Sequence, residues 1–115
     1  MIVMISSQKP DLESPINERF GRSPYLIKVE TQTISWESFS NPGISQSGGA
    51  GVAAAQFVID QKAEAVISGD FGPNASRALS TAGVHMYLFD RDITTVLQAV
   101  ENFKEGKLPM YSKLL

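Results

Sequence analysis

Short apolar runs separated by polar stretches predict five strands. Residues 2–5 form a continuous apolar run bounded by polar residues, which is typical of a central strand covered on both faces. Residues 25–29 and 33–39 are rich in β-branched and aromatic side chains and are separated by three polar residues, so they predict a hairpin. Residues 65–68 and 84–89 are two further apolar runs, and we expect each to form a strand.

Apolar residues at helical spacing predict three helices. The first covers residues 51–61 and follows a glycine run. The second covers residues 73–82, because it starts on a proline and is followed by a glycine suited to a left-handed helix end. The third is predicted to start with Asp92 as its N-cap and to continue to Gly106.

The order of these elements predicts an α/β fold. Three antiparallel strands, extended by two right-handed helical crossovers, give a five-stranded mixed sheet in the order 3-2-1-4-5 with helices on both faces. Residues 7–23 have no regular period and carry prolines and charges, so we expect a long functional loop there. With 115 residues, of which 43% are hydrophobic, we expect residues 1–115 to form a single domain.

The predicted strand directions bring the unusual segments to one edge of the sheet. The carboxyl ends of four strands and the N-termini of all three helices meet at this edge, where open α/β sheets bind ligands. Helix N-termini offer unpaired N–H groups, and glycines let a ligand approach the backbone, so we expect an anion. Asp90 and Arg91 are predicted to lie at the same edge. The candidate binding residues are Ser6, Ser7, Arg19, Phe20, Gly21, Arg22, Gly48, Gly49, Gly51, Gly69, Asp70, Phe71 and Gly72.

Each of these motifs also has a purely structural explanation. The glycine run of residues 48–51 lacks the lysine and hydroxyl of a phosphate-binding P-loop and also fits a tight helix start. Residues 69–73 also fit a short turn in which Asp70 helps to cap the following helix. Phe20 and Phe71 are better explained as core residues. Arg22 either adds a guanidinium to the anion site or is a solvated arginine.

Composition excludes several classes of function. With 10 basic and 12 acidic residues the chain has no broad basic surface, so nucleic acid is not an expected partner. Cysteine is absent, which removes disulfides, thiolate ligation of iron–sulfur clusters and thiol nucleophiles. The apolar N-terminus becomes polar too early for a signal peptide or a membrane span, so we expect a cytoplasmic protein without a membrane partner.

The sequence offers no assembled catalytic group. Ser6 and Ser7 end the first predicted strand, but His85 starts the fifth, at the opposite edge of the sheet, and cannot activate them. The first strand also lacks the carboxylate that metal-dependent nucleases of this strand order need. We therefore predict a protein that is not an enzyme, and we assign no metal ligand.

Several motifs, taken in order, resemble one known family. Residues 14–25 (SPINERFGRSPY), 49–52 (GAGV), 69–73 (GDFGP), 82–84 (AGV) and 103–108 (FKEGKL) are similar to the dinitrogenase iron-molybdenum cofactor biosynthesis family. This is the NifX-like domain, which is also found at the C-terminal end of NifB-type proteins. The resemblance covers nearly the whole chain. It implies a three-layer ribonuclease H-like fold and, in nitrogen-fixation members, carriage of an iron–sulfur–molybdenum cofactor or precursor without turnover.

The chain matches the family's motifs at most of the candidate positions but differs at one of them. The matching positions are Phe20, Gly21 and Arg22 in the family's loop, and Gly49, Gly51, Gly69, Phe71, Gly72 and Pro73 in its glycine turns. The family commonly has a histidine directly before the Phe-Gly-Arg, where this chain has Arg19, and cluster-handling members often offer Cys or His. Two functions therefore remain open. One is a carrier of an iron–sulfur or iron–molybdenum cluster, with cluster-assembly proteins as partners. The other is metal-free binding of a small anion, a metabolite or a protein.

Overall fold

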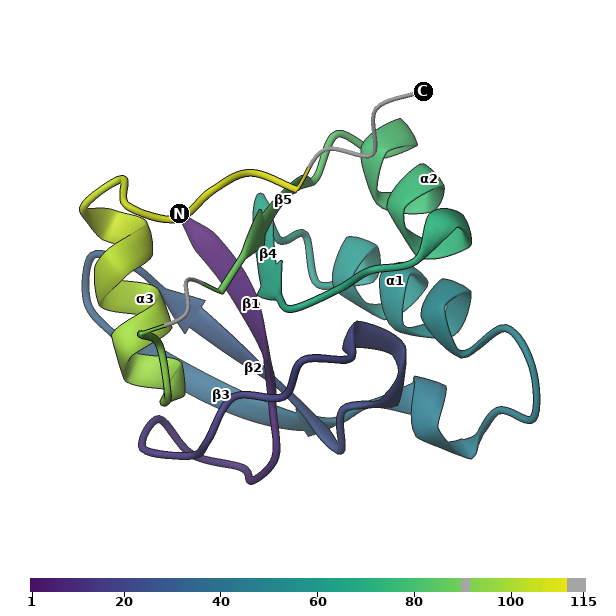
Figure 1. The fold of residues 1–115 in the computed structure, drawn as a ribbon, viewed down its shortest axis with the longest axis horizontal. Helices are drawn as coiled ribbons and strands as arrows, with labels where there is room; N and C mark the ends of the chain where they lie inside the picture. The colour runs from purple at the N-terminus through teal and green to yellow at the C-terminus, as the bar shows by residue number, and fades with distance from the viewer. Residues whose placement is uncertain (90–91, 112–115) are drawn as a thin grey trace.

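The computed structural model describes residues 1–89 and 92–111 and contains one mixed sheet (Figure 1). Its five strands run in the order β3-β2-β1-β4-β5, as predicted. The strands are β1 (Ile2–Ser7), β2 (Tyr25–Glu30), β3 (Ser35–Ser40), β4 (Ala65–Ser68) and β5 (His85–Leu88). The β1–β2 and β2–β3 pairs are antiparallel, whereas β4 is parallel to both β1 and β5. The predicted α/β fold is confirmed.

Helices cover both faces of the sheet, as expected. The helices α1 (Ala50–Asp60) and α2 (Pro73–Thr81) lie on one side, and α3 (Val96–Lys104) lies on the other (Figure 1). Two short 3₁₀ helices, η1 (Phe20–Arg22) and η2 (Pro42–Ser45), precede β2 and α1. Among the described residues, no helix has the length and apolar character that crossing a membrane requires.

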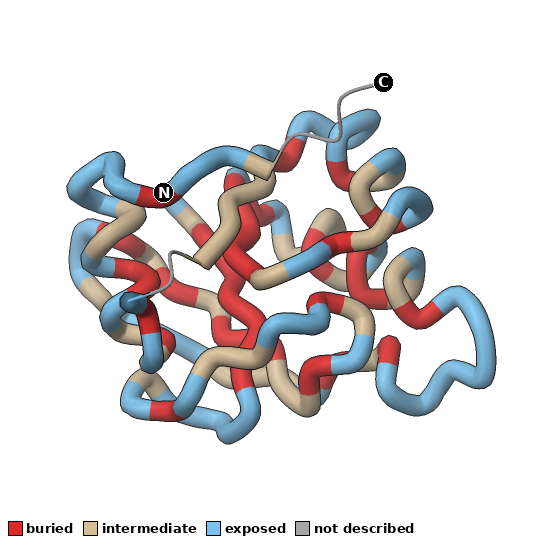
Figure 2. The backbone as a smooth tube through the Cα atoms, in the orientation of Figure 1, coloured by how far each residue is buried: buried red, intermediate tan, exposed pale blue. Residues whose placement is uncertain are grey.

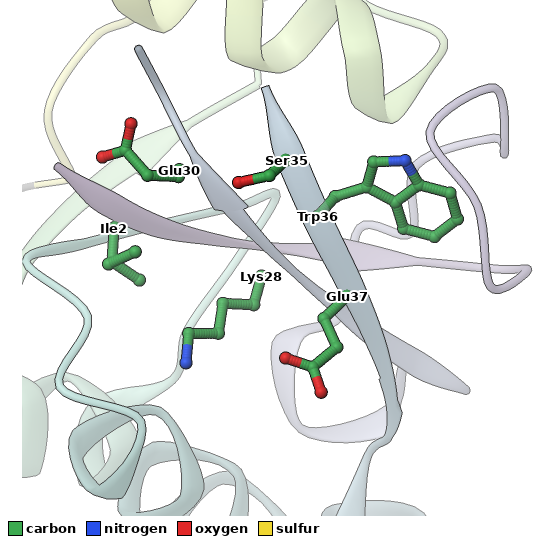
Figure 3. Close-up of a pocket in the computed structure, with 6 residues that line it drawn as sticks. All are labelled: Ile2, Lys28, Glu30, Ser35, Trp36 and Glu37. Atoms are coloured by element: carbon green, nitrogen blue, oxygen red, sulfur yellow. The ribbon is translucent and has the colours of Figure 1, made fainter. Parts of the chain in front are cut away.

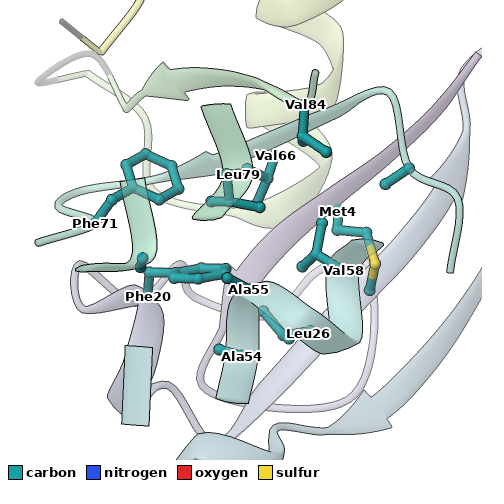
Figure 4. Packing of buried hydrophobic residues seen from close by; sticks show 12 residues of the cluster. Met4, Phe20, Leu26, Ala54, Ala55, Val58, Val66, Phe71, Leu79 and Val84 are labelled. Carbon is teal, nitrogen blue, oxygen red and sulfur yellow. The ribbon is translucent and has the colours of Figure 1, made fainter. Parts of the chain in front are cut away.

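The alternation of side chains along β1 divides the core into two clusters. Met4 packs with residues of α1 and α2, such as Val58 and Leu79 (Figure 4). Its neighbours Val3 and Ile5 point to the opposite face and pack in the cluster that contains residues of α3. Successive residues of a strand face opposite sides, so a strand buried on both faces needs an unbroken apolar run. The residues from Val3 to Ser7 are fully buried, and Figure 2 accordingly draws most of β1 in red.

The start of the third helix differs from the sequence prediction. Thr95, not Asp92, is the N-cap of α3: its hydroxyl accepts a hydrogen bond from Gln98 N at 3.2 Å, and the Gln98 side chain accepts from the Thr95 backbone. This reciprocal pair is a capping box. Ile93 fitted the helical spacing, but it is buried in the segment before the helix. The prediction for Asp92 is therefore wrong.

The hairpin of β2 and β3 is confirmed, with a shorter second strand than predicted. Ile34 has a φ of 57°, a left-handed conformation that ends the turn, and β3 starts at Ser35 rather than at residue 33. The predicted placement of Asp90 and Arg91 at the ligand edge lies outside the described residues.

Candidate functional site

A shallow hollow of about 220 Å³ lies beyond the carboxyl end of β4, between η1 and the first turns of α1 and α2. It is lined by Arg19, Phe20, Gly21, Arg22, Ala50, Gly51, Asp70, Phe71 and Gly72. We call it the anion hollow, after the ligand that the sequence predicts at this edge of the sheet. Most of the candidate residues from the sequence therefore meet in one place. A neighbouring hollow shares part of this lining and extends to Gly49 and to Asn74 of α2.

Two phenylalanines join the anion hollow to the core. Phe20 and Phe71 are 1% and 4% exposed, and their ring centroids lie 5.2 Å apart (Figure 4). Phe71 also meets Tyr111 edge to face at 5.1 Å. The core explanation of these aromatics is correct, and the hollow lies directly over this part of the core.

Three glycines around the hollow let backbones approach closely. A Cβ on Gly21 would lie 2.8 Å from Gly51 N, and a Cβ on Gly51 would lie 3.2 Å from the Ala75 side chain. A Cβ on Gly69 would lie 2.8 Å from Glu18 Cα. The start of η1 is also hydrogen-bonded to the loop that follows β4, because Phe20 N donates to Asp70 O at 3.2 Å. Gly21 thus lets η1 lie against α1, Gly51 lets α1 lie against α2, and Gly69 lets the end of β4 lie against the segment before η1.

The N-terminus of α1 is open toward the hollow. Its N-cap is Gly49, with a φ of 73° and no side-chain cap. Within the described parts of the chain, the N–H groups of Ala50, Gly51 and Val52 have no hydrogen-bond acceptor. Unpaired N–H groups and the helix dipole make such an end attractive to an anion. The N-cap of α2, Gly72, also has no side-chain cap.

The third helix N-terminus is closed, which corrects the expectation that all three helices offer N–H groups at this edge. The long loop after β1 lies against α3: Val96 N donates to Ser14 O at 3.0 Å and Leu97 N donates to Leu12 O at 2.9 Å. Together with the Thr95 cap, these bonds satisfy its first turn. Local sequence gave no sign of this contact, because the partners are far apart along the chain.

The charges at the anion hollow are two arginines and one aspartate. Arg19, Arg22 and Asp70 are all exposed. The Arg22 guanidinium is held in place, because its Nη1 donates to Gln46 O at 2.9 Å. Asp70 Oδ1 accepts from Gly72 N at 3.4 Å and so places its negative charge at the start of α2. The carboxylate thus lies against the start of α2, whereas the first turn of α1 contains no acidic residue.

Other candidate residues lie outside the lining of the anion hollow. Ser6 and Ser7 are fully buried. The Ser6 hydroxyl donates to Asn17 O at 2.6 Å, and the Ser7 hydroxyl donates to Lys9 O at the same distance. Both hydroxyls brace the long loop. Gly48 is exposed, and a side chain at this position would meet no other atom within 4 Å. Among the described residues, no three His, Cys, Asp or Glu side chains gather as a metal site.

A separate hollow of about 240 Å³ lies near the start of β1, at the edge formed by β3 (Figure 3). It is lined by Ile2, Lys28, Glu30, Ser35, Trp36 and Glu37. Hydrogen bonds from the N-terminal ammonium and from the backbone of Gln32 and Thr33 lower the pKa of the Glu30 carboxyl. The described lining has two carboxylates and one lysine, and the N-terminal ammonium is paired with Glu30, so no excess of positive charge is left to attract an anion.

Comparisons with known proteins agree on one family. The family model for the dinitrogenase iron-molybdenum cofactor matches residues 1–106. No curated protein matches the chain. The apo form of the orange protein from Desulfovibrio gigas is 32% identical, with a TM-score of 0.89 over 96% of this chain and 92% of that one.

Two further solved structures are similar. A Thermotoga protein assigned as NifB is 32% identical, with a TM-score of 0.84 over 99% of this chain and 96% of that one. A Methanocaldococcus jannaschii protein assigned as a dinitrogenase is 17% identical, with a TM-score of 0.70 over 97% and 95% of the two chains. The last likeness supports the fold alone.

Proposed function

This chain belongs to the dinitrogenase iron-molybdenum cofactor family, and we propose that it binds an iron–sulfur or iron–molybdenum cluster, or a precursor, and carries it without turnover. The main support for this proposal is that Arg22 and the uncapped first turn of α1 line the same hollow. Family membership supports the kind of cargo. The hollow supports the way in which it is held.

The lining of the hollow favours a cargo that brings its own metal ligands, because Asp70 is the one carboxylate among the described residues of that lining. The chain has no cysteine, and Arg19 stands beside the hollow where the family commonly has a histidine. N–H groups and guanidinium groups are hydrogen-bond donors, so they suit the outer sulfur or oxygen atoms of an anionic cluster and not its metal ions. Hydrogen bonds to a charged acceptor are stronger than those between neutral groups, which favours an anionic cluster here. We infer that the protein holds a preassembled cluster through hydrogen bonds to the outer atoms of the cluster.

The side chains near the hollow favour carriage over catalysis. The Ser6 and Ser7 hydroxyls are buried and bonded to backbone carbonyls of the long loop. His85 is exposed at the start of β5, at the other end of the sheet. A nucleophilic mechanism needs a base within hydrogen-bond reach of its nucleophile, and neither serine has a histidine partner.

The direct test is anaerobic reconstitution. The protein is incubated with iron, sulfide and molybdate, desalted, and analysed for metal content and visible absorption. We expect the wild type to retain coloured metal–sulfur material and Arg22→Ala to lose most of it. Arg77→Ala, which removes an exposed arginine of α2 outside the hollow, is the matched control and should behave as the wild type. A wild type that stays colourless and metal-free both in this mixture and after incubation with preformed tetrathiomolybdate would contradict the proposal.

A second function, metal-free binding of a small anion or metabolite, is favoured by the absence of cysteine. It predicts that sulfate, phosphate or simple carboxylates raise the melting temperature. A ligand at a hundredfold its dissociation constant adds about 2.7 kcal/mol of stability, which is easily measured. Stabilisation by such anions, together with failed reconstitution, would select this function over cluster carriage.

A further inference from the structure

Asn41 is a buried amide that local sequence did not single out. It is 1% exposed and is the N-cap of η2. Its Nδ2 donates to Phe20 O at 2.9 Å and to Ser23 Oγ at 3.1 Å, and its Oδ1 accepts from Gly43 N at 3.0 Å. A flipped amide would set Oδ1 against the Phe20 carbonyl, so the network fixes its orientation. The side chain thus joins η1 to η2.

The backbone and the guanidinium of Arg22 both depend on the contact between η1 and η2 that Asn41 makes. Its backbone belongs to η1, whose first carbonyl, Phe20 O, accepts from Asn41. Its guanidinium donates to the carbonyl of Gln46, the residue that ends η2. Asn41 caps the opposite end of that same short helix. If η2 shifted, the hydrogen bond between Gln46 and Arg22 would displace the guanidinium, and the bond from Asn41 to Phe20 would displace η1.

The junction also reaches the start of α1. A Cβ on Gly43 would lie 2.3 Å from Gly21 O and 2.6 Å from Ala50 O, so η2 is in backbone contact with both η1 and α1. Contacts this close leave no room for independent movement of the three segments. All three Asn41 side-chain partners lie in the two segments that carry and hold Arg22.

We propose that Asn41 is the positioning residue of the anion hollow, where it holds the Arg22 guanidinium in register with the uncapped first turn of α1. This inference rests on the proposed function for its consequence in binding. Its geometric part, that the placement of Arg22 depends on Asn41, can be tested without any ligand.

The first experiment measures Arg22 directly in the ligand-free protein. Asn41→Asp keeps the size and the acceptor for Gly43 N but removes both donors. In ¹⁵N NMR spectra we expect the Arg22 Nε–H signal, assigned by its loss in Arg22→Lys, to shift and broaden in Asn41→Asp. The Arg77 signal on α2 is the internal control and should stay in place. An unchanged Arg22 signal in folded Asn41→Asp would overturn the inference.

The second experiment is a double-mutant cycle with tetrathiomolybdate, a metal–sulfur dianion that carries its own ligands. Asn41→Ala removes the amide without adding a charge. We expect it to weaken binding about tenfold in the wild-type background and less than about twofold in Arg22→Ala, because residues that act through one another are not additive. Equal losses in both backgrounds would show a merely structural role. Val100→Ala, a core change on the α3 face, controls for lost stability and should bind normally.

The two experiments separate failure of the inference from failure of the proposed function. If the wild type does not bind tetrathiomolybdate, the metal–sulfur proposal fails for this probe, while the Arg22 signal still decides the role of Asn41. If Asn41→Asp does not fold, Ser23→Ala replaces it, because it removes one of the two Nδ2 acceptors. We expect the same direction of change in the Arg22 signal, with a smaller size.

Discussion

At Gly21 the backbone of η1 comes so close to α1 that no side chain fits between them. A Cβ there would lie 2.8 Å from Gly51 N and 2.9 Å from Gly51 Cα, and backbone atoms cannot move aside as a flexible side chain can. We therefore expect Gly21→Ala to lower the free energy of unfolding by about 1–3 kcal/mol, as overpacking typically does.

Gly48→Ala is the matched control for this prediction, because a Cβ on Gly48 meets nothing within 4 Å. It should leave stability unchanged or raise it by up to about 1 kcal/mol, through a less flexible unfolded chain. Urea unfolding curves of both variants provide the measurement. Equal effects of the two substitutions would show that Gly21 is not in close backbone contact.

Asp70 places a negative charge beside the two arginines of the anion hollow. Asp70→Asn removes this charge and keeps the oxygen that accepts from Gly72 N. We expect anion binding to strengthen by about twofold to fivefold, the range for exposed charge pairs, and the gain to shrink as salt is added. Titration of tetrathiomolybdate at low and high salt measures both effects. Asp60→Asn, at the far end of α1, should change neither.

At the scale of elements, the start of α3 depends on Thr95. Thr95→Ala removes the hydroxyl that accepts from Gln98 N, so we expect a loss of about 1 kcal/mol in the free energy of unfolding. Asp92→Ala, at the cap position predicted from sequence, should change stability by less than about 0.5 kcal/mol. Thermal or urea unfolding of the two variants distinguishes the caps, and a larger loss for Asp92→Ala would contradict the assignment.

The elements show where sequence patterns are sufficient and where they fail. The strand order followed from the unbroken apolar run of β1 and from crossovers that join parallel neighbours. The closed N-terminus of α3 could not be predicted, because Leu12 and Ser14 cap it from a loop about eighty residues earlier in the chain. Asn41 was missed for the same reason. Its neighbours Pro42 and Gly43 indicate only a turn. Its amide donates hydrogen bonds to Phe20 and Ser23, which come close to it only in the folded protein.

At the scale of the whole molecule, the anion hollow belongs to one layer. The first turns of α1 and α2 lie on the face of the sheet opposite α3 (Figure 1), and Arg22 lines the hollow next to them. The two faces have separate core clusters. Damage to the α3 layer should therefore lower stability without changing the hollow, whereas a change in the spacing of α1 and α2 should alter both.

Two alanine positions test this division, because each is nearly or fully buried in one layer. Ala75 of α2 would meet a Gly51 Cβ at 3.2 Å, so Ala75→Val pushes α2 away from α1 and separates the two helix N-termini. Ala99→Val overfills the α3 layer. We expect both to cost about 1–3 kcal/mol of stability. Tetrathiomolybdate binding should weaken about fivefold in Ala75→Val, comparable to one lost hydrogen bond, and stay unchanged in Ala99→Val. Equal binding losses at matched stability would mean that the hollow depends on the whole fold and not on the packing of α1 against α2.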